Sequence, residues 1–206
     1  MAQYFEIHPQ NPQPRLIRQT VEIIRNGGVI VYPTDSSYAL GCHLDDKSAL
    51  DRLRQIRQLD DKHDFSLICD DLSQVSQFTK MANDAYRLIK TLTPGAFTFI
   101  LDATKEVPRR LQDAKKKTIG IRIPDQAIAR ALVVELGEPL LSSTLWLPNE
   151  DSAMADPHQI RQRLQHEVEL VIDGGYLDYQ PTTVISFVQG QAQILRQGKG
   201  QASMLD

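Results

Sequence analysis

The chain of 206 residues has few cysteines and no long apolar run. Cys42 and Cys69 are too few for a disulfide framework and lack the paired spacing of a zinc site, so we expect both to be buried as small hydrophobic residues. The apolar runs VIVY and FTFI are far too short to cross a bilayer, and the N-terminus shows no basic segment followed by an apolar core. We therefore expect a cytoplasmic protein without membrane contact.

An excess of positive charge is also lacking. The net charge of −3 gives the molecule as a whole no electrostatic attraction for nucleic acid, so any affinity for RNA must come from local groups of cations. Each such group, taken alone, is also typical of a solvated face. Three groups occur, namely Arg52, Arg54, Arg57 and Lys62; Arg109, Arg110, Lys115, Lys116 and Lys117; and Arg196 with Lys199.

The sequence patterns of several common sites are missing. No G-x-G-x-x-G follows a predicted strand and no G-x-x-x-x-G-K-[ST] occurs, so neither a dinucleotide-binding fold nor a P-loop is predicted. The five histidines lack the spacing of a metal site, and no G-x-S-x-G marks a serine hydrolase. We expect no metal site and no tightly bound cofactor.

Helical and extended segments alternate through the first two thirds of the chain, and strands follow one another closely at its end. Apolar residues recur at helical spacing in 14–26, in a segment that Asp46 can cap, and in 72–78, 83–92, 126–136 and 157–164. This order predicts an α/β fold in a single domain, 1–206, with helices and a twisted sheet of parallel and antiparallel strands. The predicted strands are 28–33, 38–42, 65–69, 97–103, 118–124, 139–144, 170–173, 182–188 and 192–196.

Small polar and cationic residues stand at the ends of several predicted strands. In an α/β sheet such ends line clefts, and hydroxyl groups, backbone N–H groups and Arg side chains are the partners that a phosphate needs. The same residue types are typical of caps and turns, so both interpretations stay open at this point. The residues are Thr34 to Ser37, Arg122, Ser142 to Thr144, Thr182 with Thr183, and Arg196.

The segment VYPTDSSYALGC, residues 31–42, resembles the VYPTETVYGLGC opening of the YrdC/YciO family of threonylcarbamoyl-adenylate synthases. The resemblance continues in the family's order through PGAFTFIL, TIGIRIPD, GEPLLSST, VIDGG, PTTVI and ILRQG, and it covers roughly residues 15–198. It implies a twisted α/β sheet with a large concave basic cleft. The family's enzymes join ATP, bicarbonate and L-threonine into threonylcarbamoyl adenylate, from which partner proteins modify adenosine in tRNA.

The resemblance also implies ligands for particular residues. Thr34 and Tyr38 would lie near the amino-acid pocket, and ATP with Mg²⁺ would be the nucleotide, the ion bridging phosphates. The expected residues at the nucleotide and its phosphates are Lys62, Arg122, Thr144, Thr182 and Arg196. The RNA partner would be double-stranded RNA or tRNA, bound by a basic face, and the candidates for that face are Arg54, Arg57, Lys115, Lys116 and Lys117.

The first of two departures from the family concerns its K-x-R pair, which should lie between Ile56 and Phe65. The chain reads RQLDDKHDF at this place. Depending on the gap, Arg57 or Lys62 takes the position of the first cation, and neither is followed by a second one at the required spacing. Asp64 would repel a phosphate there. The pair is therefore incomplete.

The second departure lies in the S-x-N motif after PLL, where the synthases place a Ser and an Asn against the nucleotide. The matching residues here are Thr144, Leu145 and Trp146. The change removes an amide, and the indole of Trp146 either fills or reshapes the pocket or belongs to the core or the surface cover. The sequence leaves both interpretations of Trp146 open.

Two motifs of the site are altered in a chain that otherwise resembles the family. The fold alone therefore does not determine the function, and three hypotheses remain. The first is a protein that binds RNA or a nucleotide without catalysis and is linked to threonylcarbamoyladenosine metabolism in tRNA. The second is a weak or altered L-threonylcarbamoyladenylate synthase that uses ATP, bicarbonate and L-threonine. The third is a protein-interaction role in which the cleft is vestigial, with partners that the sequence does not identify.

Overall fold

The computed structural model describes residues 1–59, 65–188 and 190–202. Its helices are α1 (Pro14–Arg25), α2 (Lys47–Arg57), α3 (Leu72–Phe78), α4 (Asn83–Leu92), α5 (Ala127–Leu136) and α6 (Pro157–Leu164), with a short 3₁₀ helix η1 (Arg109–Leu111). Its strands are β1 (Gln3–Glu6), β2 (Ile30–Pro33), β3 (Tyr38–His43), β4 (Ser66–Ile68), β5 (Thr79–Lys80), β6 (Phe97–Ala103), β7 (Thr118–Arg122), β8 (Leu140–Thr144), β9 (Leu170–Asp173), β10 (Thr183–Ser186) and β11 (Gln193–Arg196).

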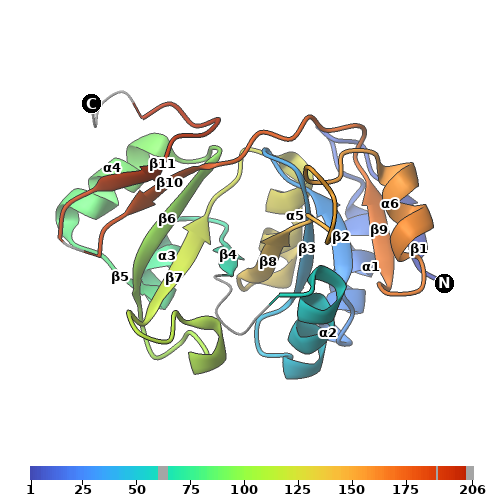
Figure 1. Ribbon diagram of the computed structural model, residues 1–206, viewed down its shortest axis with the longest axis horizontal. Helices are drawn as coiled ribbons and strands as arrows, with labels where there is room; N and C mark the ends of the chain where they lie inside the picture. Colours follow the sequence, from blue (N-terminus) through green and yellow to red (C-terminus); the bar gives the residue numbers. More distant parts are fainter. Residues whose placement is uncertain (60–64, 189, 203–206) are drawn as a thin grey trace.

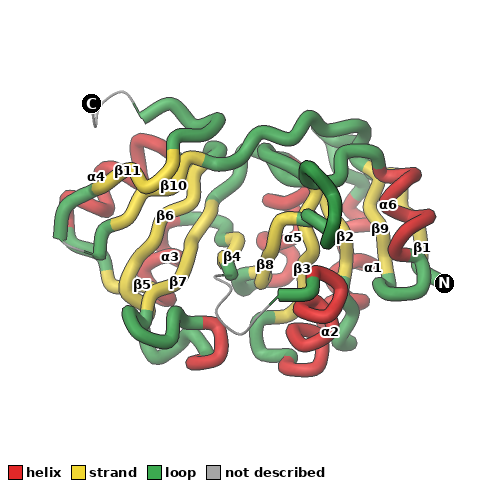
Figure 2. The backbone as a smooth tube through the Cα atoms, viewed as in Figure 1, coloured by secondary structure: helices red, strands yellow, loops and turns green. Residues whose placement is uncertain are grey.

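The strands form one twisted sheet in the order β1-β9-β2-β3-β8-β4-β7-β6-β10-β11, with β5 paired to β6 (Figure 1, Figure 2). The pairs β1/β9, β2/β9, β4/β7 and β6/β10 are parallel, and the other neighbours are antiparallel. The predicted α/β class with a mixed, twisted sheet is confirmed. The hairpin from β2 to β3 and the strand β8 bring the turn at Thr34 to Ser37 next to the centre of the sheet.

The helices cover the sheet with the apolar faces that their sequences predict. In α1 the buried residues Ile17, Val21 and Ile24 recur at helical spacing, and this face packs beside α5. The side chain of Asp46 accepts the backbone N–H of Ala49 at 2.9 Å and caps α2 as predicted. Helix α5 ends at Gly137, whose φ of +77° is the left-handed conformation that glycine adopts at helix ends.

The two cysteines are fully buried, as predicted, and neither forms a disulfide. Burial raises the pKa of Cys42 to about 12, so its thiol stays protonated at neutral pH. No helix in the described part of the chain is both long and apolar enough to span a bilayer.

Candidate functional site

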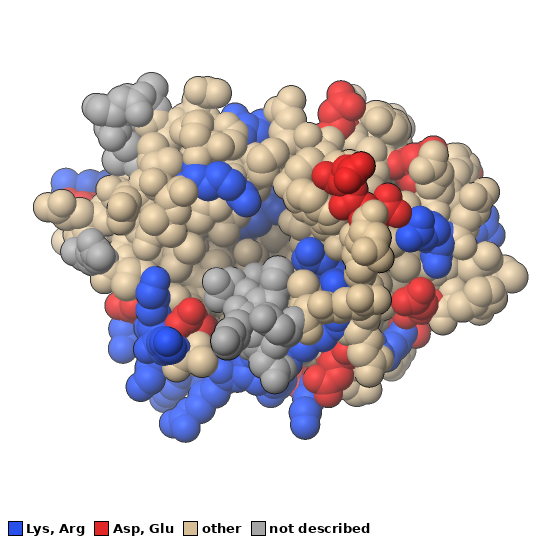
Figure 3. Space-filling view, viewed as in Figure 1, with Lys and Arg blue, Asp and Glu red and all other residues tan. Residues whose placement is uncertain are grey.

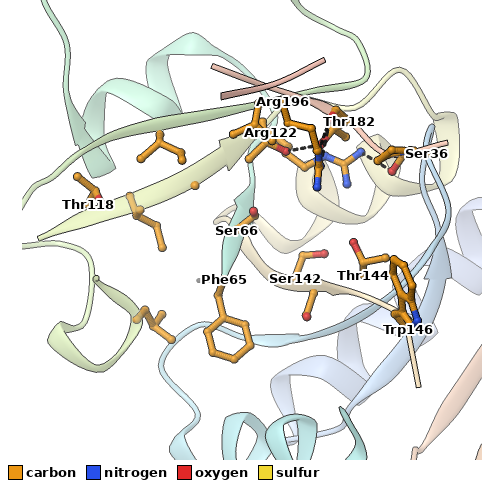
Figure 4. Close-up of a pocket in the computed structure, with 18 of the residues that line it drawn as sticks. Ser36, Phe65, Ser66, Thr118, Arg122, Ser142, Thr144, Trp146, Thr182 and Arg196 are labelled. Carbon is orange, nitrogen blue, oxygen red and sulfur yellow. Dashed lines mark hydrogen bonds between the residues drawn. The ribbon is translucent and has the colours of Figure 1, made fainter. Parts of the chain in front are cut away.

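A cavity of about 400 Å³ opens on the face of the sheet formed by β4, β6, β7, β8 and β10 (Figure 4). Figure 3 shows this hollow near the centre of one face of the molecule, with basic side chains inside it. Other parts of the wall come from the β2–β3 turn, the end of α2, and the segments that follow β8 and precede β10. The cavity therefore lies where strands far apart in the sequence meet.

Period-2 alternation in the central strands gives the cavity its polar wall. On β7, Thr118, Gly120 and Arg122 line the cavity, whereas Ile121 lies in the hydrophobic core, so Arg122 faces opposite to Ile121. On β6, Thr98 lines the cavity and its neighbours Phe97 and Phe99 lie in the core. The hydroxyls of Ser66, Ser142, Thr144 and Thr182 complete this polar face.

Arg122 anchors the β2–β3 turn to the cavity wall. Its Nη2 donates to a carboxylate oxygen of Asp35 at 2.5 Å and to the hydroxyl of Ser36 at 3.3 Å. The two side chains of the ion pair are each 7% exposed, so the pair is nearly desolvated. The Nε of Arg122 is buried and has no hydrogen-bond partner among residues 1–59, 65–188 and 190–202.

Asp35 is held from three sides. Besides the ion pair with Arg122, its second carboxylate oxygen accepts the backbone N–H of Asp125 at 2.8 Å. Its carbonyl oxygen accepts the ammonium of Lys199 at 2.6 Å, which ties the segment after β11 to the turn. These contacts fix the β2–β3 turn in one position at the mouth of the cavity.

Arg196 and Thr182 form a second polar cluster beside Arg122. The Nε and Nη2 of Arg196 donate to the carbonyl oxygen of Thr182 at 3.1 and 3.0 Å, and the Thr182 hydroxyl lies 2.8 Å from that of Thr98. Figure 4 shows Arg122, Arg196, Thr182 and Ser36 gathered at one end of the cavity. A concentration of guanidinium and hydroxyl donors is what a phosphate group requires.

Arg57, a candidate both for the RNA-binding face and for the first cation of the K-x-R pair, lines the cavity. It is the last residue of α2, and its Nη1 donates to the Ser143 hydroxyl at 2.5 Å while its Nε donates to the carbonyl oxygen of Trp146 at 3.1 Å. Burial lowers the pKa of Arg57, an effect that the nearby Tyr179 opposes. The guanidinium is thus held inside the site, partly out of water.

Thr34 and Tyr38, predicted near an amino-acid pocket, make their hydrogen bonds within the fold. The Thr34 hydroxyl donates to the carbonyl oxygen of Ser37 at 2.7 Å, which closes the turn. The Tyr38 hydroxyl donates to the carbonyl oxygen of Gly175 at 2.7 Å and accepts the N–H of Gly174 at 3.1 Å. Burial raises the pKa of Tyr38 above its usual range. Both residues are buried, and neither lines the cavity.

Among the described residues, the predicted RNA-binding residues Arg54, Lys115, Lys116 and Lys117 do not line the cavity. Lys115, Lys116 and Lys117 are exposed between η1 and β7, and Figure 3 shows Lys and Arg gathered over this β6–β7 connection, at the lower left. Arg54 is half-buried, with its guanidinium 5.5 Å from the centre of the Phe65 ring. Lys62 lies outside the described residues.

The structure brings Arg122, Thr144, Thr182 and Arg196 of the predicted phosphate-binding set to one cavity. Sequence reasoning missed Ser66, Thr98 and Gly120, which lie at alternate positions of otherwise apolar strands. That alternation was the available signal, because an apolar strand with a polar residue at every second position has one face that avoids the core.

The charged side chains that line the cavity are all cationic, and one of them, Arg122, is paired with the carboxylate of Asp35 beside the wall. Three arginines line the cavity, and among the described lining residues there is no Asp or Glu. In surroundings of low dielectric constant, such a wall favours an anionic ligand far more strongly than an exposed basic patch would. In the part of the chain that the structure describes, no three His, Cys, Asp or Glu side chains gather as metal ligands would.

Comparison with known proteins shows which family the chain belongs to. The family model Sua5_yciO_yrdC, described as telomere recombination, matches residues 22–198. YciO of Escherichia coli is 54% identical over 97% of both chains, and its crystal structure superimposes with a TM-score of 0.93 over 98% of both. Threonylcarbamoyl-AMP synthase of Vibrio vulnificus is 24% identical over 88% of this chain and 98% of that one.

A more distant solved structure shares the fold. The crystal structure of Sua5 from P. abyssi in complex with L-threonine has a TM-score of 0.87 at 22% identity, over 95% of this chain and 57% of that one. The match of sequence family and of fold extends across the cavity-lining strands. The chain belongs to the Sua5/YciO/YrdC family and is related to threonylcarbamoyl-AMP synthase.

Proposed function

We propose that the cavity binds a nucleotide, with its phosphates against Arg122, Arg196 and Thr182. The observation that carries this proposal is a wall with three arginines, several hydroxyls and no Asp or Glu among its described residues. The volume of about 400 Å³ lies within the range of roughly 300–1,000 Å³ that is typical of small-molecule sites. A duplex RNA is far too wide for such a space, whereas a single nucleotide fits it.

The family supports a link to tRNA. Because a relative is named threonylcarbamoyl-AMP synthase and a structure of Sua5 holds L-threonine, we place the nucleotide site in the cytoplasmic metabolism of threonylcarbamoyladenosine in tRNA. ATP would enter with Mg²⁺ bridging its phosphate oxygens, a mode that needs no dedicated cage of protein ligands. In this proposal the protein binds the nucleotide without having to catalyse a reaction.

The position of Arg57 favours a second candidate function, that of an altered L-threonylcarbamoyladenylate synthase. Its guanidinium lines the cavity at the end of α2, and in this proposal it serves as the first cation of the K-x-R pair. In that reaction the amine of L-threonine and bicarbonate form a carbamate with loss of water. A carbamate oxygen then displaces pyrophosphate from the α-phosphorus of ATP. Cations lower the barrier by stabilising charge on the phosphoryl oxygens.

Calorimetric titration with Mg-ATP tests the nucleotide site. We expect an Arg196→Ala variant to bind ATP roughly 10- to 100-fold more weakly, because a charge-assisted hydrogen bond contributes about 1.5–3 kcal/mol. Arg18→Ala is the matched control, since Arg18 is an exposed residue of α1, outside the cavity lining. Equal affinities of the two variants would contradict the assignment of Arg196.

A pyrophosphate-release assay separates binding from synthesis. Turnover that requires ATP, bicarbonate and L-threonine together would establish the synthase, whereas ATP binding without turnover would leave a nucleotide-binding protein. Each substrate is omitted in turn, so that simple ATP hydrolysis is distinguished from adenylate formation.

RNA binding is a further candidate, carried by the exposed lysines outside the cavity. The carboxylate of Asp113 accepts the backbone N–H groups of Lys115 and Lys116 at 2.9 and 2.5 Å, which shapes the turn and lowers the pKa of Asp113. The turn is therefore ordered while Lys115, Lys116 and Lys117 stay exposed. Such a cluster suits the phosphate backbone of duplex RNA or tRNA.

We expect a Lys115→Glu, Lys116→Glu, Lys117→Glu variant to bind a short duplex RNA and tRNA more weakly. The slope of log affinity against log salt should fall by roughly 1 for each phosphate that the variant no longer neutralises. Fluorescence anisotropy at several salt concentrations measures both. The charge-matched control is Arg15→Glu, Arg18→Glu, Lys90→Glu, three exposed positions on α1 and α4. Normal RNA binding by the lysine variant would rule out this surface.

A further inference from the structure

The cavity also has an aromatic wall, formed by Trp146 and Tyr179. Trp146 follows β8 closely, and both residues line the cavity. The Trp146 residue is 36% exposed, so it is not a core residue. This position is where the family's S-x-N motif places an Asn, and the indole replaces a hydrogen-bonding amide with a flat apolar surface.

Three hydrogen bonds hold Trp146 in place. Its backbone N–H donates to the carbonyl oxygen of Thr144 at 2.9 Å, and its own carbonyl oxygen accepts the Nε of Arg57 at 3.1 Å. Its indole Nε1 donates to the carbonyl oxygen of Glu150 at 2.8 Å, which fixes the ring orientation. A ring that is already fixed loses little conformational entropy when a ligand binds.

The ring of Tyr179 lies next to the fixed indole, and the two rings meet at a steep angle. The two ring centroids are 5.5 Å apart and the ring planes are inclined at 73°. In Figure 4 the indole stands almost edge-on at the side of the cavity, next to Thr144, so one ring face is turned toward the enclosed space. The arginines Arg122 and Arg196 lie at another side of the cavity, so these two cations are separate from the aromatic surface. The third arginine, Arg57, lies beside Trp146, to whose carbonyl oxygen it donates.

A nucleotide has the same division between an anionic and a flat aromatic part. Stacking of a base on an aromatic side chain is favourable for every base, and a wide indole provides the largest surface for it. Resting on the proposed nucleotide site, we infer that Trp146, supported by Tyr179, binds the purine base of the nucleotide by stacking. Trp146 is thereby a specificity-determining residue, since it selects a ligand with a base over one that has phosphates alone.

The chain contains a single tryptophan, so its fluorescence reports on this position alone. We expect Mg-ATP to quench the fluorescence of the wild-type protein, and inorganic tripolyphosphate, which has phosphates but no base, to bind without quenching it. Trp146→Leu should bind ATP roughly 10-fold or more weakly in calorimetry, because the stacking surface is lost. Its affinity for tripolyphosphate should be unchanged, and Trp146→Phe should retain most of the affinity for ATP.

The outcomes test the stacking on Trp146 and the proposed nucleotide site separately. If ATP binds in calorimetry but does not quench, or Trp146→Leu binds ATP as tightly as wild type, the stacking is overturned and the nucleotide site stands. If tripolyphosphate quenches as strongly as ATP, the base is not at the indole and the stacking is again overturned. If neither ligand binds the wild-type protein, the proposed function fails. The wild-type titrations do not depend on how well a variant folds.

Discussion

An Arg122→Met variant is expected to lose about 3–5 kcal/mol of its free energy of unfolding, since removing one member of a buried ion pair leaves the other charge without compensation. Asp35 would keep the N–H of Asp125 as a neutral donor but would lose the guanidinium at 2.5 Å. Both side chains are only 7% exposed, so water cannot replace the lost partner without local opening. Urea unfolding of wild type and variant measures the difference.

The double variant Asp35→Asn, Arg122→Met distinguishes two causes of the lost stability, the unpaired charge of Asp35 and the loss of packing around residue 122. The amide introduced in place of the Asp35 carboxylate is uncharged, and its oxygen can still accept the N–H of Asp125, so most of the lost stability should return. If the double variant is no more stable than Arg122→Met, the cost comes from packing around β7 rather than from the charge of Asp35. A single variant within about 1 kcal/mol of wild type would show that the pair is effectively solvated.

The helices and most strands could be predicted because the sequence patterns that indicate them lie within or next to each segment. The segments 72–78, 83–92 and 157–164 are helices with the predicted bounds, since the apolar periodicity lies within each segment and prolines mark two of the ends, Pro94 after α4 and Pro157 at the start of α6. Strand β1 was missed. It has four residues, none of them buried, and it pairs with β9 more than 160 residues later, so nothing local distinguishes QYFE from a loop. The strand order likewise depends on contacts between distant segments.

The cavity was only partly predictable, for a related reason. Polar residues at strand ends identified Arg122, Thr144, Thr182 and Arg196, because a charge or hydroxyl in an apolar strand needs a polar environment. The same argument failed to distinguish a ligand-facing hydroxyl from one used inside a turn, as in Thr34. It also left two positions open for Arg57, an RNA-binding face and the K-x-R pair, because the helical pattern does not show that the end of α2 points into the cavity.

Gly120 offers the sharpest functional test of the cavity. It lies on β7 in the wall, and a Cβ there would lie 2.8 Å from the Ser66 hydroxyl and 3.2 Å from the carbonyl oxygen of Phe65. The γ-methyl groups of a Gly120→Val variant would occupy the space between Ser66 and Thr98 that the ligand needs. We expect this variant to lose measurable binding of Mg-ATP in calorimetry. The overpacking should cost about 1–3 kcal/mol of stability, so the fold should persist.

A second substitution distinguishes a filled cavity from a damaged fold. In Gly120→Val, Ser66→Ala the hydroxyl that the new Cβ would approach is gone, so the urea midpoint should rise toward that of wild type. ATP binding should remain lost, because the γ-methyl groups still occupy the cavity floor. Recovery of binding together with stability would mean that Gly120 serves strand packing alone. ATP affinity at the wild-type level in Gly120→Val itself would place the nucleotide elsewhere, and the arginines around this cavity would then need another anionic ligand.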